Sequence, residues 1–354
     1  MTKYIIKRSL YGILVLLGVV VLVFFLFQGF GDPSRIVMGQ SGDSATQSNI
    51  RKELYLINDK GEPISKFRQF LYYLNDVSPV CIHSTGEIES KKLKGIFLGG
   101  RQKFGLKIPY LRRSYQSKRE VWNILMQALP GTLMLAVAAM CIAVMIGIPL
   151  GVMAAVRQNT WMDTSAIFSS IVGISAPSFF MGIIMVYLFG FVLSDWTGLQ
   201  IAGNWFVIDE EGHRKLTLQN LVLPAVTLGI RPLSIITQLT RSAMLDVLDQ
   251  DYIRTAYAKG LSKRAVIWKH GLKNALNPVI TAITGWFAEL LAGAFFVEYI
   301  FGWQGIGKVT VDALEKLDYP VVMGAVLVSA TFFIIINLVA DLLYGIVDPR
   351  VRVS

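Results

Sequence analysis

The chain has 354 residues, of which 53% are hydrophobic and only 16% are charged, and its mean hydropathy is +0.52. It is therefore too apolar for a soluble domain and too long for a single membrane anchor, so the composition predicts a polytopic membrane protein. The net charge of +10 does not indicate nucleic-acid binding, because the basic residues lie beside apolar runs, where membrane orientation and anionic lipid headgroups explain them. We expect membrane lipid, and no nucleic acid, among its partners.

The first apolar run covers residues 10–27 and, with its flanks, is long enough to cross the roughly 30 Å of hydrocarbon in a bilayer. Lys3, Lys7 and Arg8 precede it, which predicts a cytoplasmic N-terminus. Because no small-x-small cleavage site follows Phe27, we interpret residues 1–30 as a retained first helix rather than a signal peptide.

Residues 31–122 are polar and rich in Gly, Pro, Ser and charge, which predicts an extracytoplasmic loop or domain. Their basic pairs do not oppose this placement, because long loops are translocated largely regardless of charge. Neither strong strand alternation nor a long helical period is visible, so a tightly folded enzyme domain is not expected there. Cys81 in this segment and Cys141 in an apolar run are not expected to form a disulfide.

The rest of the chain, residues 123–354, is predicted to form the transmembrane domain, with further spans at about 124–156, 166–193, 216–240, 277–301 and 319–347. Pro224, Arg231 and Pro232 interrupt the run at 216–240. One crossing is still needed there if the basic segment that follows is to be cytoplasmic. The fold class is therefore an all-α polytopic membrane protein with six spans and with both termini in the cytoplasm.

Residues 241–277 form a basic, soluble-looking segment between two apolar blocks, and short loops rich in Lys and Arg stay cytoplasmic. Apolar residues recur within it at roughly helical spacing, and Gly260 lies where one short helix can end and the next begin. This pattern predicts a pair of short amphipathic helices on the inner face of the membrane. From the charges alone, an ordinary basic loop is an equally good interpretation.

One string in this segment, DYIRTAYAKGL at Asp251–Leu261, is followed by His270, Leu272, Asn274–Leu276 and Pro278. Together they resemble the "EAA" cytoplasmic loop of ABC importer permeases, in their dipeptide and oligopeptide branch. Only Ala256 and Gly260 match the general family pattern of Glu-Ala-Ala, three residues and Gly. Similar stretches elsewhere are Gly31–Pro33, Gly173–Phe180, Phe301–Gly307 and the closing Asp348–Arg350. The resemblance is weakest from Ile36 to Lys103, and the piece around residues 81–103 is extra length whose role stays open.

The resemblance implies the ABC type I importer permease fold, with six transmembrane helices and a long extracytoplasmic insertion after the first, in the cytoplasmic (inner) membrane of a bacterium. It implies a non-catalytic subunit that translocates di- or oligopeptides by alternating access. The implied partners are a second permease copy or paralogue, two ATPase subunits that bind ATP and Mg²⁺, and an extracytoplasmic peptide-binding protein. No cofactor is expected on this chain. In that family the loop docks into the ATPase, and the residues that the resemblance assigns to docking here are Asp251, Tyr252, Arg254, Thr255, Ala256, Lys259, Gly260 and Leu261.

The spacing of small residues in Asp251–Leu261 also predicts which helix face docks. Ala256 and Gly260 lie four residues apart, so on a helix they share a face that a partner can approach closely, with Tyr252 as an aromatic anchor.

Arg231 and Glu289 are candidates for the translocation path, because ionisable residues in spans should face protein or water. Arg231 either contacts a peptide carboxylate or pairs with Glu289. An arginine that snorkels at the cytoplasmic end is an equally good interpretation.

One motif is rejected as a nucleotide site. Gly302–Lys308 matches the Gly-x4-Gly-Lys part of a phosphate-binding loop, but Val309 replaces the Ser or Thr that ligates Mg²⁺, and a predicted span precedes it instead of a strand. His83, His213 and His270 lie in separate polar segments on both predicted sides of the membrane, so they are not expected to share a metal. Glu298 and Asp341, near their span ends, are interpreted as structural ion pairs or snorkelling residues.

Other functions stay open at this point. An ion-coupled secondary transporter would act without ATPase subunits and would carry its paired carboxylates near the bilayer midplane. An intramembrane protease is disfavoured because no catalytic pair is visible on a span. Among ABC importers, nickel complexes and glycosides are alternative substrates to peptides, because the binding protein shares in specificity.

Overall fold

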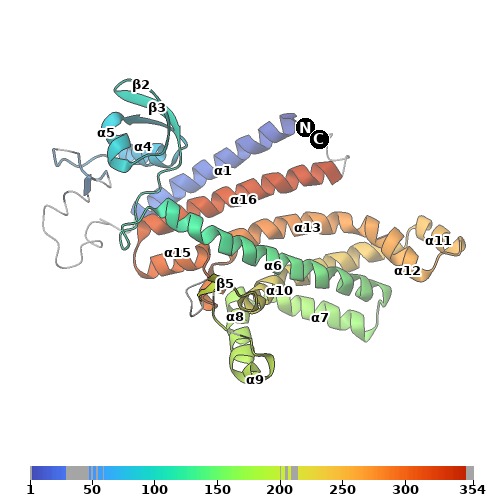
Figure 1. Ribbon diagram of the computed structural model, residues 1–354. Helices are drawn as coiled ribbons and strands as arrows, with labels where there is room; N and C mark the ends of the chain where they lie inside the picture. The colour runs from blue at the N-terminus through green and yellow to red at the C-terminus, as the bar shows by residue number, and fades with distance from the viewer. Residues whose placement is uncertain are drawn as a thin grey trace. The chain divides into compact units, whose positions relative to one another are not determined.

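The computed structural model describes residues 2–28, 48, 51–52, 55–58, 60–199, 201–203, 206–208 and 214–347, and helices dominate them (Figure 1). The stretches Gly31–Pro33 and Asp348–Arg350 and the residue His213, all used above, lie outside the described residues. The chain divides into two compact units. One comprises Met1–Arg8, Ala128–Val311 and Phe332–Ser354, and the other comprises Ser9–Gln127 and Asp312–Thr331.

The boundary between the units falls inside four helices: α1 (Thr2–Gln28), α6 (Val121–Val156), α15 (Ile306–Glu315) and α16 (Tyr319–Val347). The first unit also contains α7 (Trp161–Ser175), α8 (Ser178–Tyr187), a π-helical turn at Leu188–Val192, α9 (Ser194–Thr197), α10 (Gln219–Leu248), α11 (Asp251–Ala258), α12 (Lys263–Ala265), a second π-helical turn at Val266–Gly271, α13 (Leu272–Gly293) and α14 (Phe295–Ile300). A short antiparallel pair joins β4 (Phe206–Ile208) to β5 (Arg214–Leu216).

Helix α10 is the central element of the first unit and packs against α7, α8 and α13. It is continuous from Gln219 to Leu248, so the prolines at 224 and 232 do not interrupt it as the sequence suggested. Glycines bring α6 close to it, since a Cβ on Gly151 would lie 2.6 Å from the carbonyl oxygen of Thr237, and one on Gly229 would lie 2.8 Å from that of Ala139. Small residues at helix contacts are typical of membrane bundles.

The predicted third span, 166–193, is broken. Helix α7 ends before Ala176, which is extended at φ −77° and ψ 126°, and α8 begins after Pro177. Proline lacks an N–H group and disfavours helical geometry at the residue before it, which explains the break. The two halves, Trp161–Ser175 and Ser178–Val192, meet at 108°. They form either one bent span or a re-entrant segment.

Four described helices are long and apolar enough to cross a membrane: Ile6–Gln28, Val121–Val156, Gln219–Leu248 and Tyr319–Asp341. The bent pair raises the number to five if it counts as one span. The predicted span at 277–301 is not among them. Its helix α13 ends at Gly293 and is not apolar enough to count as a candidate span.

The second unit contains a small mixed fold after the first helix. It comprises α4 (Lys66–Val77), β1 (Val80–Ser84), α5 (Thr85–Lys91), β2 (Gly95–Gly99) and β3 (Gln102–Lys107). A capping box formed by Ser84 and Glu87 starts α5. The sheet order is β1-β3-β2, and both pairings are antiparallel. The all-α prediction is therefore wrong for this segment.

The sheet exposes its apolar side. Its outward face carries the large apolar side chains, in the cross-strand rows Val80–Leu106–Ile96 and Ile82–Phe104–Leu98, which are all exposed. Its inward face carries Cys81, His83, Gly105 and Lys107. The usual arrangement of a half-buried strand, with apolar side chains inward and polar ones outward, is thus reversed.

A buried ionic cluster stabilises the inward side of this fold. Asp76 is 1% exposed, and its carboxylate lies 2.6 Å from Nζ of Lys91 and accepts a hydrogen bond from the Tyr55 hydroxyl at 3.0 Å. Lys107 donates through Nζ to the main-chain oxygen of Asp76. Burial lowers the pKa of Lys107 to about 8. Because the buried Asp76 carboxylate is paired with the Lys91 ammonium group, its charge is not left uncompensated in the interior.

Candidate functional site

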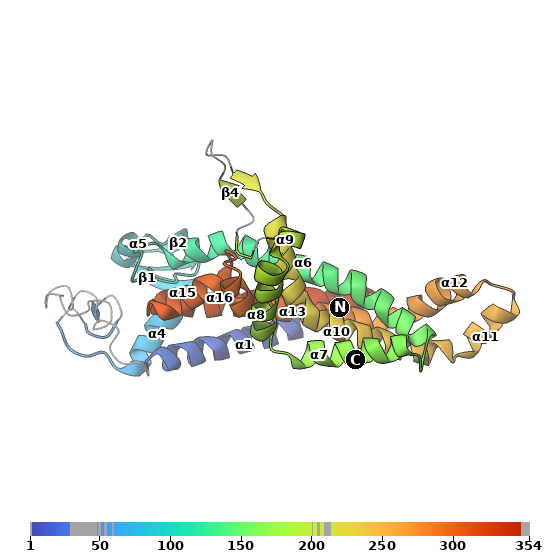
Figure 2. The same cartoon turned by 90° about the horizontal axis from the view of Figure 1, so that it is seen from below.

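A polar hairpin, defined here as residues 249–271, joins α10 to α13 at one end of the first unit, where α11 and α12 extend beyond the two long helices (Figures 1 and 2). The two predicted short helices are present, although α12 is a single turn that runs on through the π-helical turn into α13. Ser262 caps α12, since its hydroxyl accepts a hydrogen bond from the Ala265 N–H at 3.3 Å. Arg241, predicted to begin the loop, lies inside α10.

Gly260 shapes the turn of the hairpin. Its φ is +77°, and its N–H donates to the oxygen of Tyr257 at 2.9 Å, while the N–H of Leu261 donates to the oxygen of Ala256 at 3.3 Å. These two bonds form a Schellman motif, in which the position after the C-cap favours glycine. The match of Gly260 to the family pattern therefore has a local structural cause.

The inner face of the hairpin is apolar and closed. Ile253, Ala256 and Val266 are 1%, 7% and 0% exposed and pack together against Val247 and Leu248. Ala256 was predicted to present a small, open face to a partner. The structure differs, because its side chain is already covered by the returning segment of the same hairpin.

The outer face carries most of the predicted docking residues. Asp251, Tyr252, Arg254, Thr255, Lys259 and Leu261 are all exposed. Two further aromatic residues that the sequence reasoning missed, Tyr257 and Trp268, are 44% and 45% exposed. The helical period gave no signal for Tyr257, since it lies four residues after the buried Ile253 and therefore borders the buried face of the helix.

One contact fixes the hairpin on α13, because the Asn274 side-chain amide donates to the hydroxyl of Tyr252 at 2.8 Å. A second contact joins two of the long helices. Arg241 on α10 holds the carboxylate of Asp163 at the start of α7 through two hydrogen bonds, of which the one from Nη2 measures 2.8 Å. Asp163 also accepts from the N–H of Asn159 at 3.0 Å. The pair is bidentate, and Asp163 is buried.

Helix α13 carries a polar stripe: Asn274, Asn277, Thr281, Gly285 and Glu289. The other exposed residues whose side chains the structure describes on this helix are Lys273 and Pro278, so its exposed surface holds no aliphatic or aromatic side chain. The stripe follows one helix face. It explains why α13 is not apolar enough to count as a span, and such a face is not suited to lipid.

Arg231 lies beside this stripe. It is the only exposed residue of α10 between Val222 and Ser242, and its guanidinium lies over the ring of Trp286 on α13, 5.3 Å from the centroid. Trp286 and Glu289 are three residues apart and share a side of the helix. The described contacts pair Arg231 with this ring and not with Glu289, so the predicted ion pair is absent from the described residues.

The glycine-rich segment rejected as a phosphate loop surrounds a carboxylate of this chain instead. Glu298 is 0% exposed, accepts from the Thr132 hydroxyl at 2.7 Å and accepts from the N–H of Lys308 at 3.1 Å. A Cβ on Gly305 would lie 2.3 Å from this carboxylate. Glu298 is thus a buried structural acceptor and does not snorkel. Asp341 does form an ion pair, with Arg8.

Metal ligands are not gathered anywhere in the part of the chain that the structure describes, where no group of three His, Cys, Asp or Glu side chains is placed to hold an ion. The two cysteines, Cys81 and Cys141, are both free.

Known proteins resemble this chain over most of its length. Residues 147–353 match the family described as binding-protein-dependent transport system inner membrane component. The chain is 34% identical over 373 residues to the dipeptide transport system permease protein of Escherichia coli strain K12, with 99% of each chain covered. It is 36% identical over 353 residues to the oligopeptide transport system permease protein of Bacillus subtilis strain 168, covering 99% of this chain and all of that one. To the glutathione transport system permease protein of E. coli strain K12 it is 33% identical over 354 residues, with 99% of each chain covered.

The apolar helices, four or five of which are long enough to span a membrane, define a multi-pass membrane protein. The chain belongs to the family of binding-protein-dependent transport system inner membrane components, the permeases of ABC transporters. It is accordingly a non-catalytic translocation subunit and not an enzyme.

Proposed function

We propose that this permease imports di- or oligopeptides by alternating access, driven by ATP hydrolysis on separate ATPase subunits. The support is the full-length similarity to proteins named as dipeptide, oligopeptide and glutathione permeases. Nickel complexes and glycosides are the alternative cargoes that an uptake assay should include. ATP-dependent uptake of peptide by vesicles that hold the complete transporter is the expected result, and gradient-driven uptake by this chain alone would replace the proposal with a secondary transporter.

The proposed assembly contains this chain, a second permease, two ATPase subunits that hold ATP and Mg²⁺, and an extracytoplasmic peptide-binding protein. In it both termini and the hairpin are cytoplasmic, and residues 31–122 are extracytoplasmic. Six crossings satisfy this topology if α7 and α8 form one bent span and α13 with α14 forms another. A polar helix such as α13 is tolerated in a membrane where it faces protein or water.

We propose that the ATPase docks on the outer face of the hairpin. That face combines exposed aromatic residues, Tyr252, Tyr257 and Trp268, with the bases Lys259, Lys263 and Arg264. Aromatic residues dominate binding energy at interfaces, and charges at the rim steer association. The closed apolar interior makes the hairpin a stiff unit that is able to transmit a push to α10 and α13.

Replacing Tyr257 by Ala tests this docking face. We expect ATPase binding to weaken about 30-fold, which corresponds to the roughly 2 kcal/mol of an interface hot spot, with a matching loss of ATP-driven uptake. Titration of purified ATPase onto the permease in detergent measures the affinity. Tyr187, a 60% exposed tyrosine outside the hairpin, provides the matched control as Tyr187→Ala. Equal affinity for the two variants would contradict docking through this face.

We propose that Arg231 and the polar stripe of α13 line the translocation path. A charged side chain in the middle of a helix, exposed next to a polar face, requires an aqueous or protein neighbour and is suited to the carboxylate of a peptide. Arg231→Gln is expected to raise KM for peptide uptake about tenfold, through the loss of one charged contact of roughly 1.5 kcal/mol. Arg231→Lys should keep most of the affinity. An unchanged KM in Arg231→Gln would remove Arg231 from the path.

A further inference from the structure

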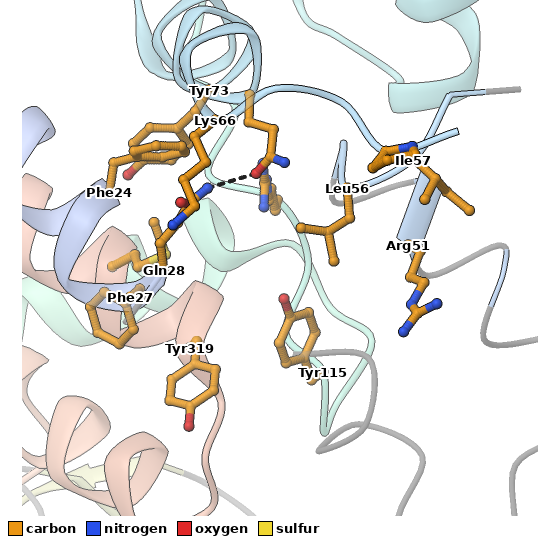
Figure 3. A pocket seen from close by; sticks show the side chains of 14 residues that line it. Phe24, Phe27, Gln28, Arg51, Leu56, Ile57, Lys66, Tyr73, Tyr115 and Tyr319 are labelled. Atoms are coloured by element: carbon orange, nitrogen blue, oxygen red, sulfur yellow. Dashed lines mark hydrogen bonds between the residues drawn. The ribbon is translucent and has the colours of Figure 1, made fainter. Parts of the chain in front are cut away.

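The second unit contains a cavity of about 400 Å³, to which the proposed function assigns no role (Figure 3). Its walls come from the end of α1, from α4, from the start of α16 and from the connecting segments. The lining includes Phe24, Phe27, Gln28, Leu56, Lys66, Tyr73 and Arg112. Most of the lining residues are aromatic or aliphatic, so one part of a ligand here would be apolar.

Three polar atoms of the lining are buried without a hydrogen-bond partner: the Tyr73 hydroxyl, Oε1 of Gln28 and Nε of Arg112. Tyr73 is only 4% exposed. The amide nitrogen of Gln28 is engaged, since it donates to Oε1 of Gln69 at 2.6 Å (Figure 3). Buried polar groups are nearly always satisfied in native proteins, so unpartnered ones that face a cavity indicate a ligand.

The cavity is also positively charged. The Arg112 guanidinium lies over the rings of Tyr55 and Tyr73, 5.6 and 5.7 Å from their centroids, and no carboxylate in the described part of the chain pairs with it. The nearby Asp76 is already paired with Lys91. Lys66 adds a second cation, and none of the described lining residues is acidic. The missing partner is therefore an anion.

The position of the cavity narrows the choice of anion. Phe24, Phe27 and Gln28 belong to the last turns of the candidate span Ile6–Gln28, and Tyr319 and Met323 belong to the first turns of the span Tyr319–Asp341. The rings of Phe27 and Tyr319 lie 5.4 Å apart. The cavity is thus at the ends of two spans, the level at which lipid headgroups meet acyl chains.

We propose that this cavity binds the headgroup region of an anionic phospholipid, with a hydroxyl-bearing headgroup such as that of phosphatidylglycerol. Arg112 and Lys66 hold the phosphate, and the Tyr73 hydroxyl donates to it. Oε1 of Gln28 accepts from a headgroup hydroxyl, which a phosphate alone cannot supply. The first part of an acyl chain lies against Phe24, Phe27 and Met323. The bound lipid ties the first helix to the small mixed fold that follows it.

The test is a lipid titration of the complete, delipidated transporter in detergent, followed by native mass spectrometry. Phosphatidylglycerol and phosphatidylcholine of equal chain length are the two probes. We expect saturable binding of phosphatidylglycerol only. Arg112→Gln should weaken it about tenfold, and Tyr73→Phe about fivefold. Arg113→Gln is the matched control, because this neighbouring base does not line the cavity, and it should bind as the unmodified chain does.

A cavity-filling variant keeps the test decisive if Arg112→Gln fails to fold. Leu56→Trp retains every charge and should abolish the saturable binding. Equal retention of the two lipids, or unchanged phosphatidylglycerol binding in both Arg112→Gln and Leu56→Trp, would overturn the proposal. Displacement of phosphatidylglycerol by a short peptide at transport concentrations would overturn it as well, and would assign the cavity to cargo. Neither result bears on the polar hairpin, so the proposed function is tested separately.

Discussion

Asp163→Ala is expected to destabilise the permease by about 3–5 kcal/mol, because it leaves the charge of Arg241 without its partner in a mostly buried position. The substitution also removes the acceptor for the Asn159 N–H, so the turn before α7 loses its anchor. The contact joins the start of α7 to α10 about two turns before α10 ends. We expect a lower unfolding temperature in detergent and little transporter assembled in the membrane.

The double variant Asp163→Ala with Arg241→Leu separates a buried unpaired charge from a general loss of packing. Removing both partners of a buried pair is often close to neutral, so the double variant should be clearly more stable than Asp163→Ala alone. Asp195→Ala, at an exposed carboxylate, is the control for loss of an acidic residue. If the double variant were as unstable as the single one, the pair would matter through its shape and not through its charge.

Much of the helical body could be predicted because span length and apolar composition are local properties. The first, second and last spans correspond to α1, α6 and α16, and the prediction of 319–347 for the last agrees with Tyr319–Val347. The bend at Ala176 was not predicted, although Pro177 was visible. A proline inside a span either kinks or breaks the helix, and the surrounding packing decides between these outcomes.

The hairpin shows what periodicity alone leaves undecided. The sequence predicted two short helices but chose the face of Ala256 and Gly260 as the open one. Ile253 and Ala256 instead pack against Val266, which comes from the other side of the turn. Only the geometry of the Gly260 turn brings these residues together, and such a tertiary contact is not encoded in either helix by itself. Gly260→Trp would therefore break a turn as well as alter the proposed docking face.

The polar stripe and the inverted sheet were missed for a related reason. The sequence predicted a span at 277–301 because hydropathy averaged over a window combines both faces of α13 and hides a polar stripe on one of them. In residues 80–107 the apolar runs Val80–Ile82 and Ile96–Leu98 break the alternation that would predict a strand. The sequence shows whether each of these side chains is polar or apolar, whereas its burial or exposure depends on which neighbours it meets in the fold.

Glu298 presents the reverse case, a residue whose importance the sequence did not show. Its carboxylate accepts from the Thr132 hydroxyl and from the N–H of Lys308, and Thr132 in turn accepts from the N–H of Ile306 at 2.8 Å. The indole of Trp303 donates to the oxygen of Gly131 at 2.8 Å and closes the same contact. A carboxylate of this chain thus takes the place that a phosphate has in a nucleotide loop.

Glu298→Ala is therefore expected to destabilise the permease by roughly 3 kcal/mol or more, because it removes the acceptor for the buried Thr132 O–H and for the Lys308 N–H and leaves a cavity. Thermal unfolding in detergent and the yield of assembled transporter measure this loss. Gly307→Ala tests the same contact from the other side, since its Cβ would lie 2.4 Å from Cα of Phe295. The matched control is Glu289→Ala, at an exposed carboxylate of the polar stripe, which should keep normal stability while it alters peptide uptake. A stable Glu298→Ala variant with impaired uptake would instead move Glu298 from the structural framework to the transport path.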